Sequence, residues 1–295
     1  IELRAARWPA TRAPRRGTVC VFPGRTEPIE KYFEVVADLR RRGFAVAVLD
    51  WRGQGGSSRL LADPAKGHVR SFKDYDRDLA AFMREVVLPD CPPPYYALAH
   101  SMGGNILLRT AARGASWFDR MVLVAPMLAI NQARTPVNLS VARFGVEVLG
   151  TLGLAQAMIP GGHRVPEEMR NGFEDNPFTT DRERFMRYRK VLEVSPSLGI
   201  GSPTLGWVRA AGRSMAWLAR PDVVRAIQVP ILFISAGDER IVSTPAVERL
   251  ASRLKLAAYV TVPLARHEVL MERDEHRARF WAAFDAYLGV TAAAA

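Results

Sequence analysis

The sequence contains few cysteines and has no long uninterrupted apolar segment. Cys20 and Cys91 are too few for the disulfide framework of a secreted domain, so we expect a reduced, cytoplasmic setting. No run reaches the roughly 18–20 uncharged apolar residues of a membrane-spanning helix. The first residues also lack the apolar core of a secretory signal. These absences exclude a disulfide-rich scaffold and favour a globular protein.

Lysine is also scarce, although basic residues as a whole are plentiful. Five of the 41 basic residues are lysines, which leaves 36 arginines, and the net charge is +11. This charge fits arginines spread over a solvated surface, and it also fits attraction to an anionic surface. The chain has no nucleic-acid motif and no stripe of alternating basic and aromatic residues. We therefore expect no nucleic-acid partner, and a negatively charged membrane is the better candidate for any peripheral contact.

Short apolar runs alternate with helical patterns along much of the chain. This alternation is typical of an α/β fold, with a mostly parallel sheet covered by helices on both faces. At 295 residues the chain is long enough for one such domain with an insertion. The expected strands are 18–22, 44–49, 95–99, 120–125, 231–235 and 259–262. The expected helices include 28–42, 71–88, 105–112 and 274–288, and another begins at residue 244.

The alternation stops between about residues 127 and 228, where helical patterns and loops occur without a clear strand. We interpret residues 127–228 as a helical cap, inserted into an α/β core of residues 1–126 and 229–295. An apolar face recurs through the first part of the cap: Val137, Phe144, Val148, Leu152 and Leu154. Such a face fits packing against the core, and it also fits a lid that lines an acyl-chain pocket or touches a membrane.

Ser101 follows an apolar run and precedes two glycines and a helical segment. A strand, a sharp turn and a helix around a serine form a nucleophile elbow, which holds the hydroxyl in a strained, exposed position. Small residues must flank the serine because strand and helix approach closely there, and Ala99 and Gly103 meet this need. A serine hydroxyl is a poor nucleophile without a base. The elbow therefore predicts a base and an acid further along the chain.

His267 and an acidic pair follow the last two expected strands. His100 is a weaker candidate base, because strand alternation should direct it away from Ser101. The remaining histidines lie in expected loops or in the final helix: His68, His163 and His276. Asp238 and Glu239 follow the 231–235 strand, and either carboxylate is able to accept the imidazole N–H and fix its tautomer. Nucleophile, acid and base then occur in the chain order of α/β-hydrolases.

Ester cleavage through a tetrahedral intermediate needs two backbone N–H donors. Met102 directly follows the nucleophile, which is where an elbow supplies one donor. The other is expected from Arg25, because Gly24 lets the backbone turn close to the site. A glycine-rich segment, residues 50–57, lacks the phosphate-binding pattern and its lysine. We expect it to be a structural loop in which Asp50 and Arg52 bond the backbone.

With these residues in place, the chain resembles the serine-hydrolase family of monoacylglycerol lipases and bacterial lysophospholipases. The resemblance is carried by the elbow and by residues 24–33, 50–57 and 67–75. Two cap segments, NPFTTDRERF (176–185) and GSPTLGW (201–207), are similar to the lysophospholipase branch in particular.

Two departures from the family pattern concern the site. The family register, three residues before a valine, favours Glu239 over Asp238, although the family acid is usually aspartate. Pro23 stands where lipase relatives usually have histidine, next to the expected oxyanion loop. Both the acid and the oxyanion geometry therefore stay open.

The resemblance implies a serine esterase that releases a fatty acid from a lysophospholipid through an acyl-enzyme. It implies no metal and no organic cofactor. A monoacylglycerol lipase or a general carboxylesterase is the nearest alternative. Other chemistry on the same fold, such as a carbon–carbon hydrolase or a cofactor-free haloperoxidase, and a non-catalytic membrane-binding scaffold also remain open. A long apolar cavity under the cap would favour a lipid substrate.

Overall fold

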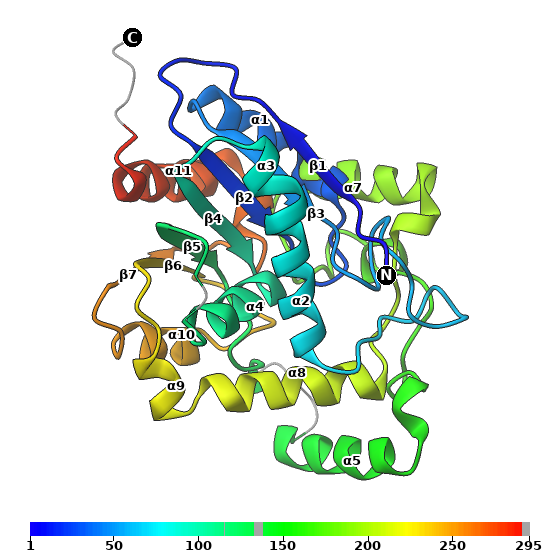
Figure 1. The fold of residues 1–295 in the computed structure, drawn as a ribbon. Coiled ribbons are helices and arrows are strands. Elements are labelled where there is room, and N and C mark those ends of the chain that lie inside the picture. Colours follow the sequence, from blue (N-terminus) through cyan, green and yellow to red (C-terminus); the bar gives the residue numbers. More distant parts are fainter. Residues whose placement is uncertain (115, 133–137, 291–295) are drawn as a thin grey trace.

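The computed structural model describes residues 1–114, 116–132 and 138–290. Its strands form one sheet in the order β1-β3-β2-β4-β5-β6-β7 (Figure 1). β1 is antiparallel to β3, and every other neighbouring pair is parallel. The strand bounds are β1 Ala5–Trp8, β2 Thr18–Phe22, β3 Ala45–Leu49, β4 Tyr95–His100, β5 Arg120–Val124, β6 Ile231–Ala236 and β7 Ala257–Val262. The predicted α/β class is confirmed.

Helices cover both faces of this sheet, as predicted. The helices that bury apolar side chains against one face are α1 (Phe33–Arg41) and α11 (Asp274–Leu288). Those on the other face are α2 (Phe72–Phe82), α4 (Met102–Ala111) and α10 (Thr244–Ala251). The sheet is therefore the middle layer of three (Figure 1).

The β2 strand shows why the central strands are recognisable in the sequence. All five of its residues are buried; Cys20 and Phe22 belong to the core shared with α2 and α4, whereas Val19 and Val21 belong to the core shared with α1 and α11. Successive strand residues face opposite sides of a sheet, so a strand covered on both sides is a continuous apolar run.

The edge strand β1 is missing from the predicted strands. It pairs only with β3 and is only partly buried, and Arg7 interrupts its short apolar pattern. An edge strand in this position needs fewer β-forming residues than a central one, so its pattern is weak.

Two predicted helices are less regular than expected. Residues 28–42 begin with a 3₁₀ turn, Ile29–Tyr32, before α1 starts. The helix expected at 71–88 continues beyond α2 as a π-helical segment, Met83–Val87, and then as α3 (Leu88–Asp90). Hydrophobic periodicity predicts helix here but does not distinguish these variants.

The described residues between β5 and β6 form helices and contribute no strand to the sheet. These helices are α5 (Leu139–Thr151), α6 (Glu167–Arg170), α7 (Arg182–Val194), α8 (Leu205–Leu218) and α9 (Pro221–Arg225). α8 packs against α2 and α4, with α5 on its other side (Figure 1). Val137, predicted in the apolar face, lies outside the described residues. Among the described helices, none combines the length and apolar character needed to cross a membrane.

Candidate active site

Ser101 occupies a sharp turn between β4 and α4. Its backbone has φ 48° and ψ −110°, a conformation that costs energy for any residue with a side chain. Gly103 is required here, because a Cβ atom at this position would lie 2.3 Å from the carbonyl oxygen of Phe22. The strand and helix therefore meet as closely as the sequence pattern predicts for an elbow.

Three side chains from the ends of different strands meet at this turn. His267 Nε2 lies 3.0 Å from Ser101 Oγ, and His267 Nδ1 lies 2.8 Å from Glu239 Oε2 and 3.0 Å from Glu239 Oε1. Ser101 follows β4, Glu239 follows β6 and His267 follows β7. All three are buried. The arrangement has the order and the contacts of a nucleophile, a base and an orienting acid.

Glu239 is held in place by more than the histidine. Its Oε1 atom accepts hydrogen bonds from the backbone N–H groups of Ile241 at 2.8 Å and Val242 at 3.2 Å. Burial by itself would raise the pKa of Glu239, but the neighbouring imidazole and these N–H groups lower that pKa below its ordinary value. An ionised Glu239 accepts a hydrogen bond from Nδ1–H and so favours the tautomer that presents unprotonated Nε2 to Ser101.

Asp238, the other candidate acid, lies in a different environment. Its carboxylate pairs with Arg240 at 2.5 Å and lies 3.8 Å from the Nε atom of Arg266. It is half-buried, whereas Glu239 is buried. The structure therefore brings Glu239 to His267 and directs Asp238 toward arginines.

The two predicted oxyanion donors flank the elbow. Met102 begins α4, and the first N–H groups of a helix have no partner within the helix. Arg25 lies in the loop after β2, whose preceding residues, Phe22 and Pro23, contact the elbow at Gly103. Both backbone segments adjoin the elbow, and the binding of an oxyanion by these N–H groups stays a prediction.

The oxyanion loop is tied to a buried polar network that the sequence did not reveal. Glu27 accepts hydrogen bonds from Gly24 N–H and from Tyr32 Oη at 2.7 Å, and its carboxylate contacts His100 Nδ1 at 3.0–3.1 Å. Lys31 forms ion pairs with Glu27 at 3.3 Å and with Glu268. The only sign of this network in the sequence is the i, i+4 spacing of Glu27 and Lys31, which suits an ion pair.

His100 links this network to the catalytic histidine. Its Nε2 lies 3.1 Å from the backbone carbonyl oxygen of His267, and its Nδ1 faces the Glu27 carboxylate. Both ring nitrogens face acceptors, so the doubly protonated form satisfies them best. Burial opposes this charge, but Glu27 raises the pKa of His100 above its ordinary value. The His100 ring lies 4.7 Å from the His267 ring, measured between centroids, so His100 supports the base and contacts Glu27 and the His267 backbone in place of Ser101.

A cavity of about 480 Å³ opens beside Ser101 and His267. Part of its lining is apolar and comes from α8, from the loop after β5 and from the loop after β6: Met127, Ile130, Val208, Ala211, Met215, Ile241 and Val242. Another part is charged: Arg25, Glu167, Glu168, Arg170 and Glu268. The cavity thus offers both an apolar and a polar surface next to the serine, as an amphiphilic ester requires.

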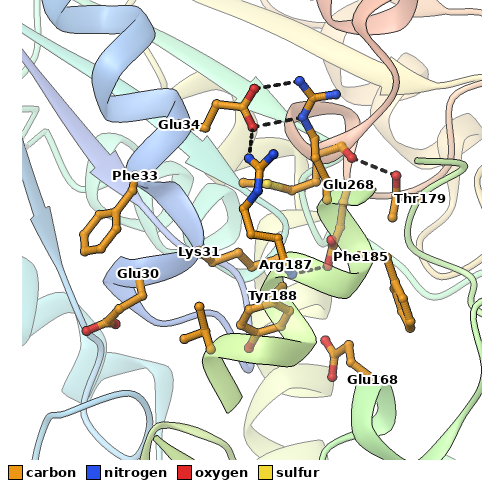
Figure 2. A pocket seen from close by; sticks show the side chains of 13 residues that line it. Glu30, Lys31, Phe33, Glu34, Glu168, Thr179, Phe185, Arg187, Tyr188 and Glu268 are labelled. Carbon is orange, nitrogen blue, oxygen red and sulfur yellow. Dashed lines mark hydrogen bonds and ion pairs between the residues drawn. The ribbon is translucent and has the colours of Figure 1, made fainter. Parts of the chain in front are cut away.

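A second cavity of about 410 Å³ adjoins the first. Glu168 and Glu268 line both cavities, and Lys31 and Tyr188 also line the second. Figure 2 shows these side chains around the second cavity, with Glu168 free of the dashed lines that mark hydrogen bonds and ion pairs. The two glutamates therefore stand where the cavities meet.

The glycine-rich loop at residues 50–57 is structural, with one difference from the prediction. Asp50 bonds the backbone as expected, accepting from Ile29 N at 2.9 Å and Gly56 N at 2.7 Å. Arg52 was expected to bond the backbone, but its guanidinium pairs with the carboxylate of Asp78 at 2.5 Å. A bidentate carboxylate is a better match for an arginine fork than a carbonyl is.

No group of three or more histidine, cysteine, aspartate or glutamate side chains is arranged to hold a metal ion in the described part of the chain. The remaining histidines take no part in the triad geometry. His68 contacts the hydroxyl of Thr204 at 2.8 Å, and His276 lies in α11.

Comparison with known proteins shows the family of this chain. The family described as serine aminopeptidase, S33, matches residues 13–274. The chain belongs to this family. The predicted class, a serine hydrolase with the α/β-hydrolase fold, is confirmed by this match.

Curated relatives and a solved structure extend the likeness over nearly the whole chain. Lysophospholipase L2 of Escherichia coli K12 is 33% identical over 289 residues, which cover 94% of this chain and 81% of the relative. Monoacylglycerol lipase of Mycolicibacterium smegmatis is 28% identical over 269 residues, with 88% and 84% covered. The crystal structure of a soluble variant of monoglyceride lipase from Saccharomyces cerevisiae, in complex with a substrate analogue, matches with a TM-score of 0.77 and 17% identity. That match covers 99% of this chain and 92% of the yeast chain.

Proposed function

We propose that this serine ester hydrolase acts as a lysophospholipase, which releases a fatty acid from a lysophospholipid. The observation that carries the proposal is the Ser101–His267–Glu239 contact chain beside a cavity with an apolar part and a charged part. The likeness to lysophospholipase L2 over 94% of the chain supports this substrate class.

In the proposed mechanism, Ser101 Oγ attacks the ester carbonyl carbon while His267 Nε2 takes the hydroxyl proton. Glu239 stabilises the imidazolium that forms, and the N–H groups of Met102 and Arg25 bind the oxyanion. The tetrahedral intermediate collapses, and His267 gives the proton to the leaving glycerol oxygen. Water, deprotonated by His267, then attacks the acyl carbon, the bond to Ser101 Oγ breaks, and His267 returns the proton to Oγ as the fatty acid leaves.

We also propose that residues 127–228 act as the cap that selects the acyl chain. α8 contributes Val208, Ala211 and Met215 to the apolar part of the cavity. Glu147 of α5 pairs with Arg209 and Arg213 of α8 at 2.7 Å, which joins the outer cap helix to the cavity-lining one. An apolar cavity lining favours a fatty acyl group over the small polar substrates of other hydrolases of this fold.

The direct test is hydrolysis of acyl-matched lysophosphatidylcholine, lysophosphatidylethanolamine and monoacylglycerol by the wild-type protein and by Ser101→Ala. The proposal expects turnover of lysophospholipids that disappears in Ser101→Ala. Turnover of monoacylglycerol alone would support the alternative, a monoacylglycerol lipase.

Peripheral contact with an anionic membrane is a second proposal, carried by the exposed apolar side chains of α5. Phe144 is 72% exposed and Leu152 is 70% exposed on a chain with a net charge of +11. Exposed apolar side chains and basic charge together favour binding at an anionic lipid surface. Co-sedimentation with phosphatidylglycerol vesicles should fall in Phe144→Ser/Leu152→Ser, and equal sedimentation of the two proteins would contradict the contact.

A further inference from the structure

Two of the charged side chains that line the cavity beside Ser101, Arg25 and Glu168, have buried polar atoms without a hydrogen-bond partner, and neither side chain has a role in the proposed chemistry. Among the residues that the structure describes, neither forms an ion pair. A buried charge is costly unless a partner of opposite charge or a set of hydrogen bonds compensates it. The surroundings of Arg25 and Glu168 therefore indicate which ligand groups would supply their missing partners.

Glu168 is almost fully buried, with 2% of its surface exposed. Both carboxylate oxygens lack a hydrogen-bond partner. The nearby cation, Lys31, is already paired with Glu27 and Glu268. Burial raises the pKa of Glu168 to about 7, although the charge of Lys31 opposes the shift. The carboxylate thus lacks donors, and it lies where the two cavities meet.

Arg25 has the opposite charge and is also incompletely bonded. Its guanidinium lies over the ring of Trp207, 5.3 Å from the centroid, and its Nη2 donates to the carbonyl oxygen of Gly201 at 2.5 Å. Its Nε atom is buried without an acceptor. Burial lowers the pKa of Arg25 to about 10, so the group is still a cation at neutral pH. Glu167 and Glu168 line the same cavity, and their charges partly offset the effect of burial on the pKa of Arg25, but neither carboxylate forms an ion pair with the guanidinium.

We infer that Arg25 and Glu168 form a head-group subsite for a lysophospholipid with a primary ammonium group. Arg25 binds the phosphate, because a guanidinium fork matches phosphate oxygens. Glu168 binds the ammonium. The inference rests on the proposed function, since a monoacylglycerol would leave both charges unpaired.

The position of Arg25 fits this assignment. Its backbone N–H is a proposed oxyanion donor, so its side chain begins at the reacting ester. In a lysophospholipid the ester carbon and the phosphorus are separated by the glycerol unit, a span comparable to the length of an arginine side chain. The guanidinium is therefore within reach of the phosphate while the ester lies at Ser101.

Glu168 distinguishes between amine head groups. Its buried oxygens need N–H donors, and the ammonium of ethanolamine supplies them. The quaternary ammonium of choline has no N–H and leaves both oxygens without a hydrogen bond. A charge-assisted hydrogen bond of this kind corresponds to roughly ten- to one-hundred-fold in specificity.

The test is the ratio of kcat/KM for lysophosphatidylethanolamine to that for lysophosphatidylcholine with the same acyl chain. We expect a wild-type ratio of about ten or more, falling close to one in Glu168→Gln. Glu174→Gln, a change at an exposed carboxylate of the same segment, should keep the wild-type ratio. A wild-type ratio near one, or an unchanged ratio in a folded Glu168→Gln, would overturn the subsite.

Arg25 is tested by a second ratio, lysophosphatidylethanolamine over monoacylglycerol. It should fall roughly tenfold or more in Arg25→Met and less in Arg25→Lys, which keeps the positive charge. Equal falls in both variants, or none, would contradict a phosphate contact.

Calorimetric binding of the two lysophospholipids to Ser101→Ala, below their micelle concentrations, separates this inference from the proposed function. Tighter binding of the ethanolamine lipid, without any lysophospholipid turnover by the wild type, would support the subsite and overturn the function. Lysophospholipid turnover with equal binding of both lipids would overturn the subsite alone.

Discussion

Glu239 and Glu168 are both buried carboxylates of the same site, but their surroundings are opposite. Glu239 receives hydrogen bonds from His267, Ile241 and Val242, and its pKa is lowered. Glu168 receives none, and burial raises its pKa to about 7. The hydrogen bonds of Glu239 are all in place before substrate binds, as an orienting acid requires. Glu168 has no hydrogen-bond donors of its own, and our inference is that the substrate supplies them.

Glu27 shows that this fold is able to satisfy a buried carboxylate fully. Burial by itself would raise its pKa, but His100 and Lys31 hold the pKa of Glu27 well below its ordinary value. Its bonds to Gly24 N–H and to His100 connect the oxyanion loop with the backbone of His267. The lack of hydrogen-bond partners at Glu168 is thus confined to this cavity and is not general to the buried carboxylates of the fold.

The largest effect that tests the comparison of Glu239 with Glu168 is the loss of catalysis in Glu239→Gln. Glu239→Gln keeps the shape of the side chain but removes the charge that stabilises the imidazolium of His267. We expect kcat on a soluble short-chain ester to fall roughly 10³–10⁴-fold. The matched control is Asp238→Asn, which should change kcat by less than about threefold. The opposite order of effects would make Asp238 the acid.

The next effect is on stability. Glu27→Gln removes the anion that compensates Lys31 and His100, and breaking such a buried network costs about 3–5 kcal/mol. Urea denaturation at pH 7 measures the loss. Glu183→Gln removes an exposed ion pair with Arg187 and should cost about 0–1 kcal/mol. A similar small cost for Glu27→Gln would show that the network does not hold the loops together.

The smallest effect is the pH dependence of stability at Glu168. Its folded pKa of about 7 lies above its ordinary value of 4.5. Between these values the folded state holds a proton that the unfolded state has lost, so stability falls as pH rises and levels off above about pH 7. Glu168→Gln removes this penalty and should be the more stable protein at pH 8, by as much as about 3 kcal/mol.

Denaturation midpoints at several pH values between 4.5 and 8 measure the difference between Glu168→Gln and wild type. For Glu239→Gln the difference from wild type should be nearly constant over this range and should shrink only below about pH 4.5, because the stabilisation from the lowered pKa of Glu239 is fully present above its ordinary pKa of 4.5. Parallel slopes for the two variants would remove the distinction between the two carboxylates.

The sequence predicted the parts of the site that depend on position along the chain. Ser101 follows the apolar run of β4, His267 follows the β-branched and aromatic residues of the edge strand β7, and chain order then indicates their roles. The choice between Asp238 and Glu239 was open, because neighbouring residues share the same pattern and differ only in the contacts of the folded loop.

The network around His100 and the unpaired Glu168 were not predictable in this way. Glu27, His100 and Glu268 are far apart in sequence, and only the folded backbone brings them together. Glu168 belongs to a charged stretch that resembles a solvated surface, and its burial depends on how α6 packs against α7 and the rest of the fold. The edge strand β1 was missed for a related reason, since its pairing with β3 determines it more than its own residues do.

The central claim is that Ser101 is the nucleophile of an ester hydrolase, and kcat for ester hydrolysis by Ser101→Ala tests it most directly. We expect wild-type turnover to fall at least about 10³-fold, with covalent labelling by a fluorophosphonate probe lost at the same time. Wild-type rates of ester hydrolysis in Ser101→Ala would contradict the claim.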